Sequence, residues 1–139
     1  MKNLLTAIAS RHSGSALSTD VGGRIYLDKV PDDEMPATFP YIIYFIVAGN
    51  PEDVFAKKGK RILMQWSLFS ASSGLTEITT MYADLAALFD DYDLTITSNT
   101  CVSMHEANLA TMIEDMIVND ATQQVRHWAV DYEIITQAA

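Results

Sequence analysis

Two stretches of the chain carry apolar residues at the spacing of an amphipathic helix. The first is residues 2–12, where no proline or glycine interrupts the pattern and polar residues 13–15 end it. The second is residues 75–90, where Ser73 is the expected N-cap and Glu77 lies in the first turn, favoured there by the helix dipole. Its apolar stripe consists of Leu75, Ile78, Tyr82, Leu85 and Phe89.

Strands are predicted where apolar residues run continuously or alternate with polar ones. Residues 41–48 are apolar throughout and rich in β-branched and aromatic side chains, which is typical of a central strand covered on both faces. Residues 29–40 contain three of the four prolines and an acidic cluster, so they predict an exposed loop. In all, five strands are expected, at 24–28, 41–48, 61–68, 94–97 and 127–134.

Residues 100–118 fit two patterns. Apolar side chains at positions 109, 112, 113, 116 and 117 have helical spacing, whereas residues 100–104 resemble a strand and Asn119-Asp120 can form a turn. We favour a long hairpin that pairs this stretch with the last strand. The expected fold is then one α+β domain over residues 1–139. It is a mainly antiparallel sheet with two amphipathic helices packed on it and a C-terminal β-hairpin.

The amino-acid composition favours a single globular domain. The 139 residues are 49% apolar and 19% charged, which fits a single globular domain and excludes disorder or a coiled coil. A single cysteine, Cys101, forms no internal disulfide, which suits a protein of the reducing cytosol or one assembled there. The N-terminus has no signal-peptide core, and the longest apolar run is eight residues, so no membrane span is expected.

The charge is divided unevenly along the chain. The net charge of −9 argues against direct binding of nucleic acid, because an acidic surface repels phosphates. Residues 1–61 hold 8 basic and 7 acidic side chains, while residues 62–139 hold 1 basic and 11 acidic ones. Four of the nine cations are grouped in an expected loop: Lys57, Lys58, Lys60 and Arg61. This basic cluster either keeps a loop soluble or docks on an acidic surface of a neighbouring copy, and such head-to-tail contacts generate rings.

Residue types used in catalysis form no recognisable motif. The three histidines and Cys101 lack zinc-ligand spacing, and no phosphate-binding glycine motif is present. His127, Asp131 and Glu133 share one face of the last predicted strand, where a carboxylate pair is capable of acid–base chemistry. Alternating charges are also what a half-solvated strand requires, and we favour that interpretation. We expect no cofactor, no metal and no enzymatic activity.

Several short motifs in order along the chain resemble one family. A Leu-Leu-x-Ala-Ile helix precedes Gly23-Arg-Ile-Tyr-Leu27 and Phe39-Pro-Tyr-Ile-Ile-Tyr44, and the chain closes on Ala-Val-Asp-Tyr-Glu-Ile-Ile135. This arrangement resembles the tail-completion, or tail-terminator, proteins of long-tailed bacteriophages and prophages. The likeness covers nearly the whole chain and is weakest over residues 100–118. It implies scaffold roles for Arg24, Ile25, Tyr26, Pro40 and Tyr41.

The resemblance implies a structural virion protein of the phage tail, assembled in the host cytoplasm. Such proteins cap the tail tube as a ring, usually of six copies, and the head connector docks on them. The implied partners are further copies of the chain, the tail tube protein and a head-completion protein, with DNA passing through the ring. The basic cluster is then a candidate subunit or tube contact. Asp90, Asp91 and Asp93 are candidates for lining the lumen or facing a partner. The alternatives are another neck, head–tail adaptor or tube component, or an unrelated binding module or enzyme.

Overall fold

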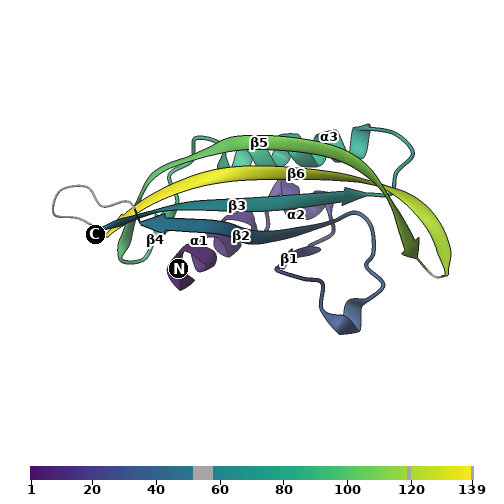
Figure 1. Cartoon of the computed structure of the whole chain (residues 1–139), viewed down its shortest axis with the longest axis horizontal. Coiled ribbons are helices and arrows are strands. Elements are labelled where there is room, and N and C mark those ends of the chain that lie inside the picture. The colour runs from purple at the N-terminus through teal and green to yellow at the C-terminus, as the bar shows by residue number, and fades with distance from the viewer. Residues whose placement is uncertain (52–57, 119, 139) are drawn as a thin grey trace.

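A six-stranded sheet with the strand order β1-β2-β3-β6-β5-β4 forms the frame of the protein (Figure 1). The computed structural model describes residues 1–51, 58–118 and 120–138. Every strand pair is antiparallel except β1 with β2, which is parallel. The strands are β1 (Ile25–Leu27), β2 (Tyr41–Pro51), β3 (Gly59–Ser70), β4 (Thr95–Ile96), β5 (Asn99–Val118) and β6 (Ala121–Ala138).

Helices α1 (Lys2–His12), α2 (Ala16–Asp20) and α3 (Thr76–Phe89) lie on one face of this sheet (Figure 1). Alternate residues of β3 point toward them, and Trp66 at the centre is fully buried. Its ring lies 5.0 Å from that of Phe89 in α3 and 5.5 Å from that of Tyr132 in β6. The main core is therefore a layer of side chains between three helices and the central strands, and the predicted α+β class is confirmed.

The predicted helix over 2–12 is confirmed, and the second predicted helix appears as α3. Its N-cap is Leu75 and not Ser73, and no side chain caps it. The helix α2 was not predicted, because five residues are too few to show a periodic pattern. It starts where the Ser15 hydroxyl accepts a hydrogen bond from the Ser18 amide at 3.2 Å.

Residues 100–118 form strand β5 and pair with β6 as the favoured hairpin. Their helical spacing has a simple cause: this part of the hairpin carries apolar side chains on both faces. In the strand register, Met112 pairs with His127 and lies on the same face of the sheet, while Ile113 pairs with Arg126 and lies on the opposite face. The alternation continues with Met116 and Ile117. Pairs of adjacent apolar residues four positions apart satisfy a helix template as well as a two-faced strand.

A second, smaller cluster lies on the sheet face that has no helices. It joins Val30, Tyr41, Phe69 and Val125, and the prolyl loop over 28–40 covers it. That loop contains a single 3₁₀ turn, η1 (Asp32–Glu34). Strand β2 is therefore covered on both faces only where it begins, and Val47 near its other end is exposed. The prediction of a central strand covered throughout was wrong in this respect.

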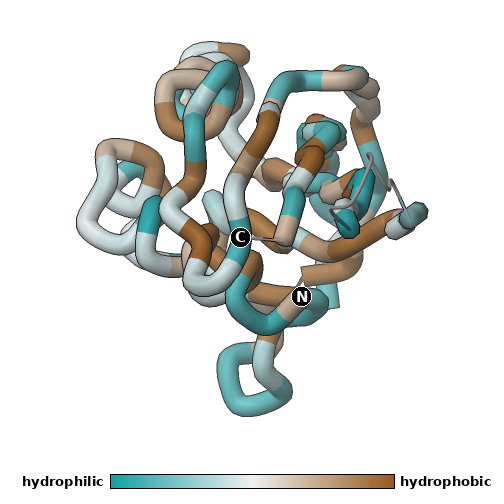
Figure 2. Tube along the Cα trace, turned by 90° about the vertical axis from the view of Figure 1, so that its left-hand side faces the viewer, coloured by the Kyte–Doolittle hydropathy of each residue, from teal (hydrophilic) through white to brown (hydrophobic). Residues whose placement is uncertain are grey.

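The long axis of the protein separates two different ends. Both termini lie at one end, which Figure 2 views directly, and the turn of the β5–β6 hairpin lies at the other (Figure 1). In α1, Asn3 Nδ2 donates a hydrogen bond to the Thr97 carbonyl at 2.9 Å, which holds this helix beside β4 at the terminal end. None of the described helices is both long and apolar enough to cross a bilayer.

Candidate functional site

The basic cluster predicted at 57–61 is divided by the structure. Lys57 lies outside the described residues. Lys60 and Arg61 belong to strand β3 and not to a loop, so their side chains project to opposite faces of the sheet. Arg61 lies on the helix-free face, where its Nη1 is 3.2 Å from Glu133 Oε1. His105 Nε2 is 3.8 Å from the same oxygen.

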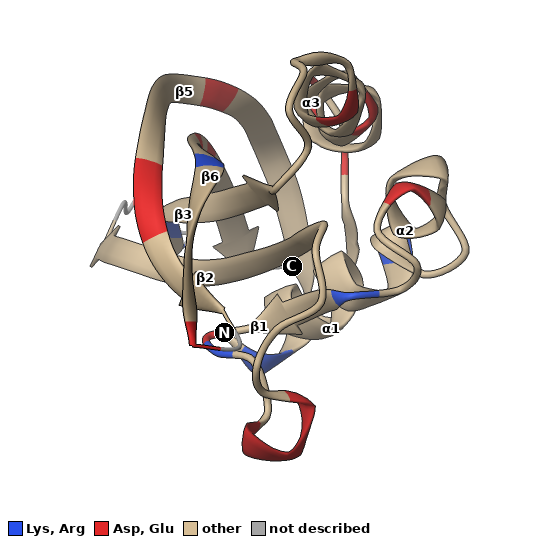
Figure 3. Cartoon of the chain, turned by 90° about the vertical axis from the view of Figure 1, so that its right-hand side faces the viewer, with Lys and Arg blue, Asp and Glu red and all other residues tan. Residues whose placement is uncertain are grey.

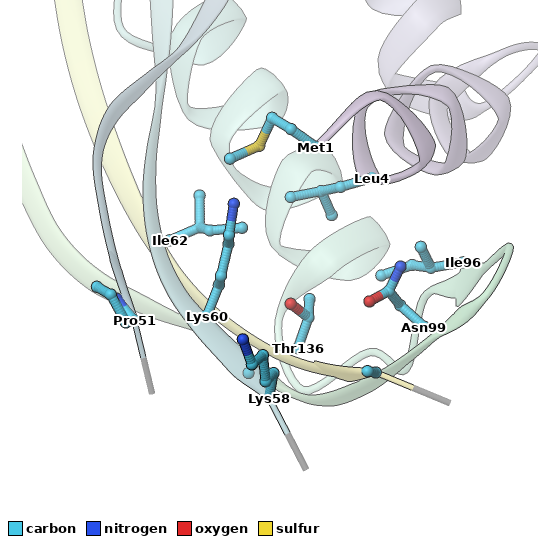
Figure 4. A pocket seen from close by; sticks show the side chains of 11 residues that line it. Met1, Leu4, Pro51, Lys58, Lys60, Ile62, Ile96, Asn99 and Thr136 are labelled. Atoms are coloured by element: carbon cyan, nitrogen blue, oxygen red, sulfur yellow. The ribbon is translucent and has the colours of Figure 1, made fainter. Parts of the chain in front are cut away.

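Lys58 and Lys60 line a pocket of about 440 Å³ at the end where the chain termini lie, here called the terminal pocket. Its apolar floor comes from Leu4 of α1, Ile62 of β3 and Ile96 of β4, all of them buried. Figure 4 shows the Lys60 side chain extending beside Ile62 toward Met1. The pocket thus combines an apolar floor with two ammonium groups at its rim.

The opposite end of the molecule is the tip half of the hairpin, here called the hairpin arm (residues 111–118 and 120–126). It extends past the helices (Figure 1). Its outer face carries Ile113, Asp115 and Ile117 at alternate positions of β5. Ile113 is 61% exposed and Ile117 is 79% exposed. Such exposure of neighbouring isoleucines on one face is a common mark of an interaction surface.

The inner face of the arm is anchored to the rest of the protein. Met116 packs against the second cluster beneath the prolyl loop. His127 stacks on the Phe69 ring at 4.3 Å between centroids, and its Nδ1 lies 3.2 Å from Glu114 Oε1. Because these contacts hold the inner face of the arm, its outer face points in a fixed direction relative to the rest of the protein.

The acidic residues Asp90, Asp91 and Asp93 follow α3 and are all exposed. Asp90 Oδ1 accepts a hydrogen bond from the Glu106 amide at 3.1 Å, and the Asp91 amide donates to the Met104 carbonyl at 2.8 Å. Two of the three thus tie the end of α3 to strand β5. Figure 3 views the molecule from the hairpin end, where acidic residues are spread over the hairpin, α3 and the prolyl loop.

The base of the hairpin is held to α3 by a further contact. The Tyr82 hydroxyl lies 2.6 Å from Glu106 Oε1 and 2.9 Å from Oε2. This hydrogen bond, together with burial and the carboxylate charge, raises the pKa of Tyr82 to about 12. Beyond Glu106 the register of β5 shifts, and the arm begins a few residues later.

The residue types that were candidates for catalysis occupy structural positions. Burial raises the pKa of the Cys101 thiol, which disfavours the reactive thiolate. Burial lowers the pKa of His12, whose ring packs edge-on against Tyr44 at 5.3 Å. Asp131 and Glu133 do share the helix-free face, as predicted, but Glu133 is engaged by Arg61. Within residues 1–51, 58–118 and 120–138, no three metal-ligating side chains are grouped as a metal site.

Sequence reasoning located the lysines but missed the terminal pocket and the outer face of the arm. The pocket is built from five strands and a helix that are distant in the chain, so no local pattern encodes it. The doubled pattern Met112-Ile113 and Met116-Ile117 was a usable signal, since a hairpin cannot bury both faces unless two layers cover it. The molecule therefore has two unlike ends, one with an apolar pocket rimmed by lysines and one with exposed isoleucines on the hairpin arm.

Comparison with known proteins identifies the family. The model of the family described as tail completion protein gp17 matches residues 3–137, so the chain belongs to that family. It is a structural protein located in the phage virion tail. None of the curated proteins compared with the chain matches it significantly.

Two solved structures share the fold. One is a chain in the virion of a native gene transfer agent particle, with a TM-score of 0.72 and 16% identity. The match covers 99% of this chain and 96% of that one. A second solved chain matches with a TM-score of 0.55 and 14% identity over 96% of this chain and 94% of its own. At these identities the likeness concerns the fold alone.

Proposed function

We propose that the chain caps the tail tube as a ring of six copies, ends tube polymerisation and offers the surface on which the head connector docks. The observation that carries the proposal is membership of the tail completion family together with two unlike ends on one subunit. Unlike ends join head to tail, and repeated head-to-tail contacts close into a ring when the rotation per subunit permits. The role is structural and requires no catalysis and no cofactor.

The basic cluster is the proposed contact of each subunit with its neighbour or with the tube. Lys58 and Lys60 are at the rim of the terminal pocket, where an acidic surface of another chain has access to them. Arg61 faces the other side of the sheet beside Glu133, so its part in a contact is separate from theirs. If changing Lys57, Lys58, Lys60 and Arg61 together to Ser leaves both oligomer mass and tail joining unchanged, this assignment is wrong.

The acidic residues after α3 are proposed to line the lumen or face a partner. Six copies at −9 each give −54, and this charge must lie away from the subunit contacts for the ring to be stable. Asp90, Asp91 and Asp93 are exposed and so are available for such a surface. A negative lumen would keep passing DNA from adhering to the wall. A ring structure with a basic lumen would contradict this assignment.

Light scattering coupled to size exclusion, at several concentrations and two salt levels, tests ring formation. A ring is expected at about 92 kDa, six times the chain mass of 15.4 kDa, and it should weaken in salt because charged contacts are screened. Electron microscopy with purified tail tubes then tests capping, with rings expected at one end of tubes of uniform length. Long tubes formed by the pure protein would indicate a tube subunit instead. Failure to bind tubes in any assembly state would refute the proposal.

A further inference from the structure

The outer face of the hairpin arm is an apolar surface that lacks a covering layer. Helix α3 covers the neighbouring part of this face but begins at Thr76, and the arm extends past it (Figure 1). Ile113 and Ile117 are left 61% and 79% exposed, with Asp115 between them. Exposed aliphatic side chains gain free energy when a partner removes them from water, at about 25 cal/mol per Å².

The terminal pocket has the complementary character. Its floor is aliphatic, through Leu4, Ile62 and Ile96, and its rim carries the ammonium groups of Lys58 and Lys60. In the part of the chain that the structure describes, neither ammonium group has an ion-pair partner. A ligand that brings aliphatic side chains and a carboxylate together would match both features.

From these two surfaces we infer that the hairpin arm of one copy docks in the terminal pocket of the next copy. Ile117 covers the apolar floor, and Asp115 pairs with Lys58 and Lys60 at the rim. The inference rests on the proposed ring and names the surfaces that build it. The termini and the hairpin arm lie at opposite ends of the long axis, so the arm of one chain cannot reach the terminal pocket of the same chain (Figure 1).

Charge favours this pairing over a symmetric contact between two arms. From residue 107 to residue 125 the hairpin holds three acidic side chains, Glu114, Asp115 and Asp120, and no basic one. Two arms packed face to face would place like charges together, which costs free energy in a contact that excludes water. Docking on the lysine rim replaces that repulsion with attraction. The arm is also anchored by Met116 and His127, so little conformational entropy is lost when it binds.

Disulfide trapping tests the pairing even if the contact is weak in solution. In a Cys101→Ser background, one protein carries Ile117→Cys on the arm and a second, mass-tagged protein carries Asn99→Cys in the pocket lining. The two proteins mixed under mild oxidation should give a mixed disulfide on a non-reducing denaturing gel, while each alone should remain largely without a cross-link. A matched control replaces Asn99→Cys with Leu75→Cys, an exposed position outside the pocket, and should trap far less.

Charge reversal provides a second, independent test of the docking contact. Lys58→Glu with Lys60→Glu should raise the concentration needed for ring formation about tenfold or more, as should Asp115→Lys with Asp120→Lys. A protein carrying all four changes has its charges reversed at both ends, so assembly should recover. Urea denaturation of each variant shows that it is folded, because all four side chains are exposed.

Several outcomes would overturn the inference. Trapping of Ile117→Cys with itself, or equally with Leu75→Cys, would indicate a symmetric or non-specific contact. Rings that form normally when Ile113 and Ile117 are both changed to Ser would show that the arm is not the occupant, while the proposed capping function would stand. Loss of tube binding at normal ring mass would show that the arm binds the tube. Conversely, specific trapping by a protein that never caps tubes would support the contact and refute the capping function.

Discussion

Replacing Tyr82 with Phe removes the hydroxyl that links α3 to the base of the hairpin. The ring stays, so its edge contact with Trp128 at 5.9 Å is preserved and only the hydrogen bond to Glu106 is lost. The bond joins the longest helix to strand β5 just before the hairpin arm. Its loss should therefore lower overall stability and loosen the direction in which the arm projects.

The magnitude of the effect follows from the geometry and the pKa. A phenol–carboxylate hydrogen bond of 2.6 Å is charge-assisted, and such bonds are stronger than neutral ones. A rise in the pKa of Tyr82 from 10.0 to about 12 corresponds to at most about 2.7 kcal/mol. Because Tyr82 is only partly buried, water competes for both groups, and we expect a loss of about 1–1.5 kcal/mol.

Urea denaturation followed by tryptophan fluorescence measures this loss, and its pH dependence provides an independent check. The pKa of Tyr82 is raised in the folded state, so the stabilisation is complete below pH 10 and declines as the pH rises toward 12. The stability difference between wild type and Tyr82→Phe should shrink over the same interval. The difference between their phenolate absorbance titrations should show one group titrating well above 10.

Tyr92→Phe is the matched control. In the described part of the chain the Tyr92 hydroxyl has no hydrogen-bond partner, while its ring lies 3.6 Å from the Arg11 guanidinium carbon, a contact that Phe retains. This control should change stability by less than about 0.5 kcal/mol. Glu106→Gln should lose part of what Tyr82→Phe loses, and the double variant should lose little more. The reasoning is refuted if Tyr82→Phe is as stable as Tyr92→Phe, or if the absorbance difference shows a phenol titrating near 10.

Three further predictions concern the core, the arm and a carboxyl pair. Burial, and then the hydrogen bond and charge of Asp84, raise the pKa of Asp20 to about 6, so the fold gains stability as the pH falls from 7 through 6. Asp84→Asn should stabilise the protein by about 0.5–1 kcal/mol near pH 7 and flatten that dependence in urea titrations; an unchanged slope would contradict this. Trp66→Ala should cost about 3–5 kcal/mol in the same assay, since the ring is fully buried among other aromatic rings, and a loss below about 2 kcal/mol would mean that the core closes around the space. Met116→Ser should speed hydrogen exchange along the hairpin arm while strand β3 keeps its protection; equal acceleration in both would show that the arm is not a separately anchored unit.

Local pattern was sufficient for most of the secondary structure. The spacing of apolar residues placed α1, α3 and the alternating strands, because each buries one face against the same core and so must repeat with the period of its own backbone. The pattern failed where that condition does not hold. Helix α2 is too short to repeat, and Ser73 was expected to cap a helix that begins after Leu75.

Of the candidate site, only the grouping of charged residues could be predicted from the sequence. The group of lysines is visible in the sequence, but Lys60 and Arg61 separate to opposite faces once the strand begins at Gly59. The acidic residues after α3 were expected to serve a lumen or a partner, and the structure shows in addition that Asp90 bonds the Glu106 amide. A group of charges in the sequence does not show which distant residues will lie beside it in the folded protein.

The sequence by itself determined the α+β class, the helix and strand periods, the uneven distribution of charge and the likeness to tail completion proteins. All of these depend on the order of residues over short distances. The tertiary structure alone decided that α1 and the five strands β2 to β6 meet at one end around an apolar pocket with lysines at its rim. It also decided that the hairpin extends past α3 at the other end with two isoleucines uncovered. The terminal pocket and the outer face of the arm both depend on where each helix and strand ends relative to its neighbours. Those relative positions are set by the packing of segments that are far apart in the chain.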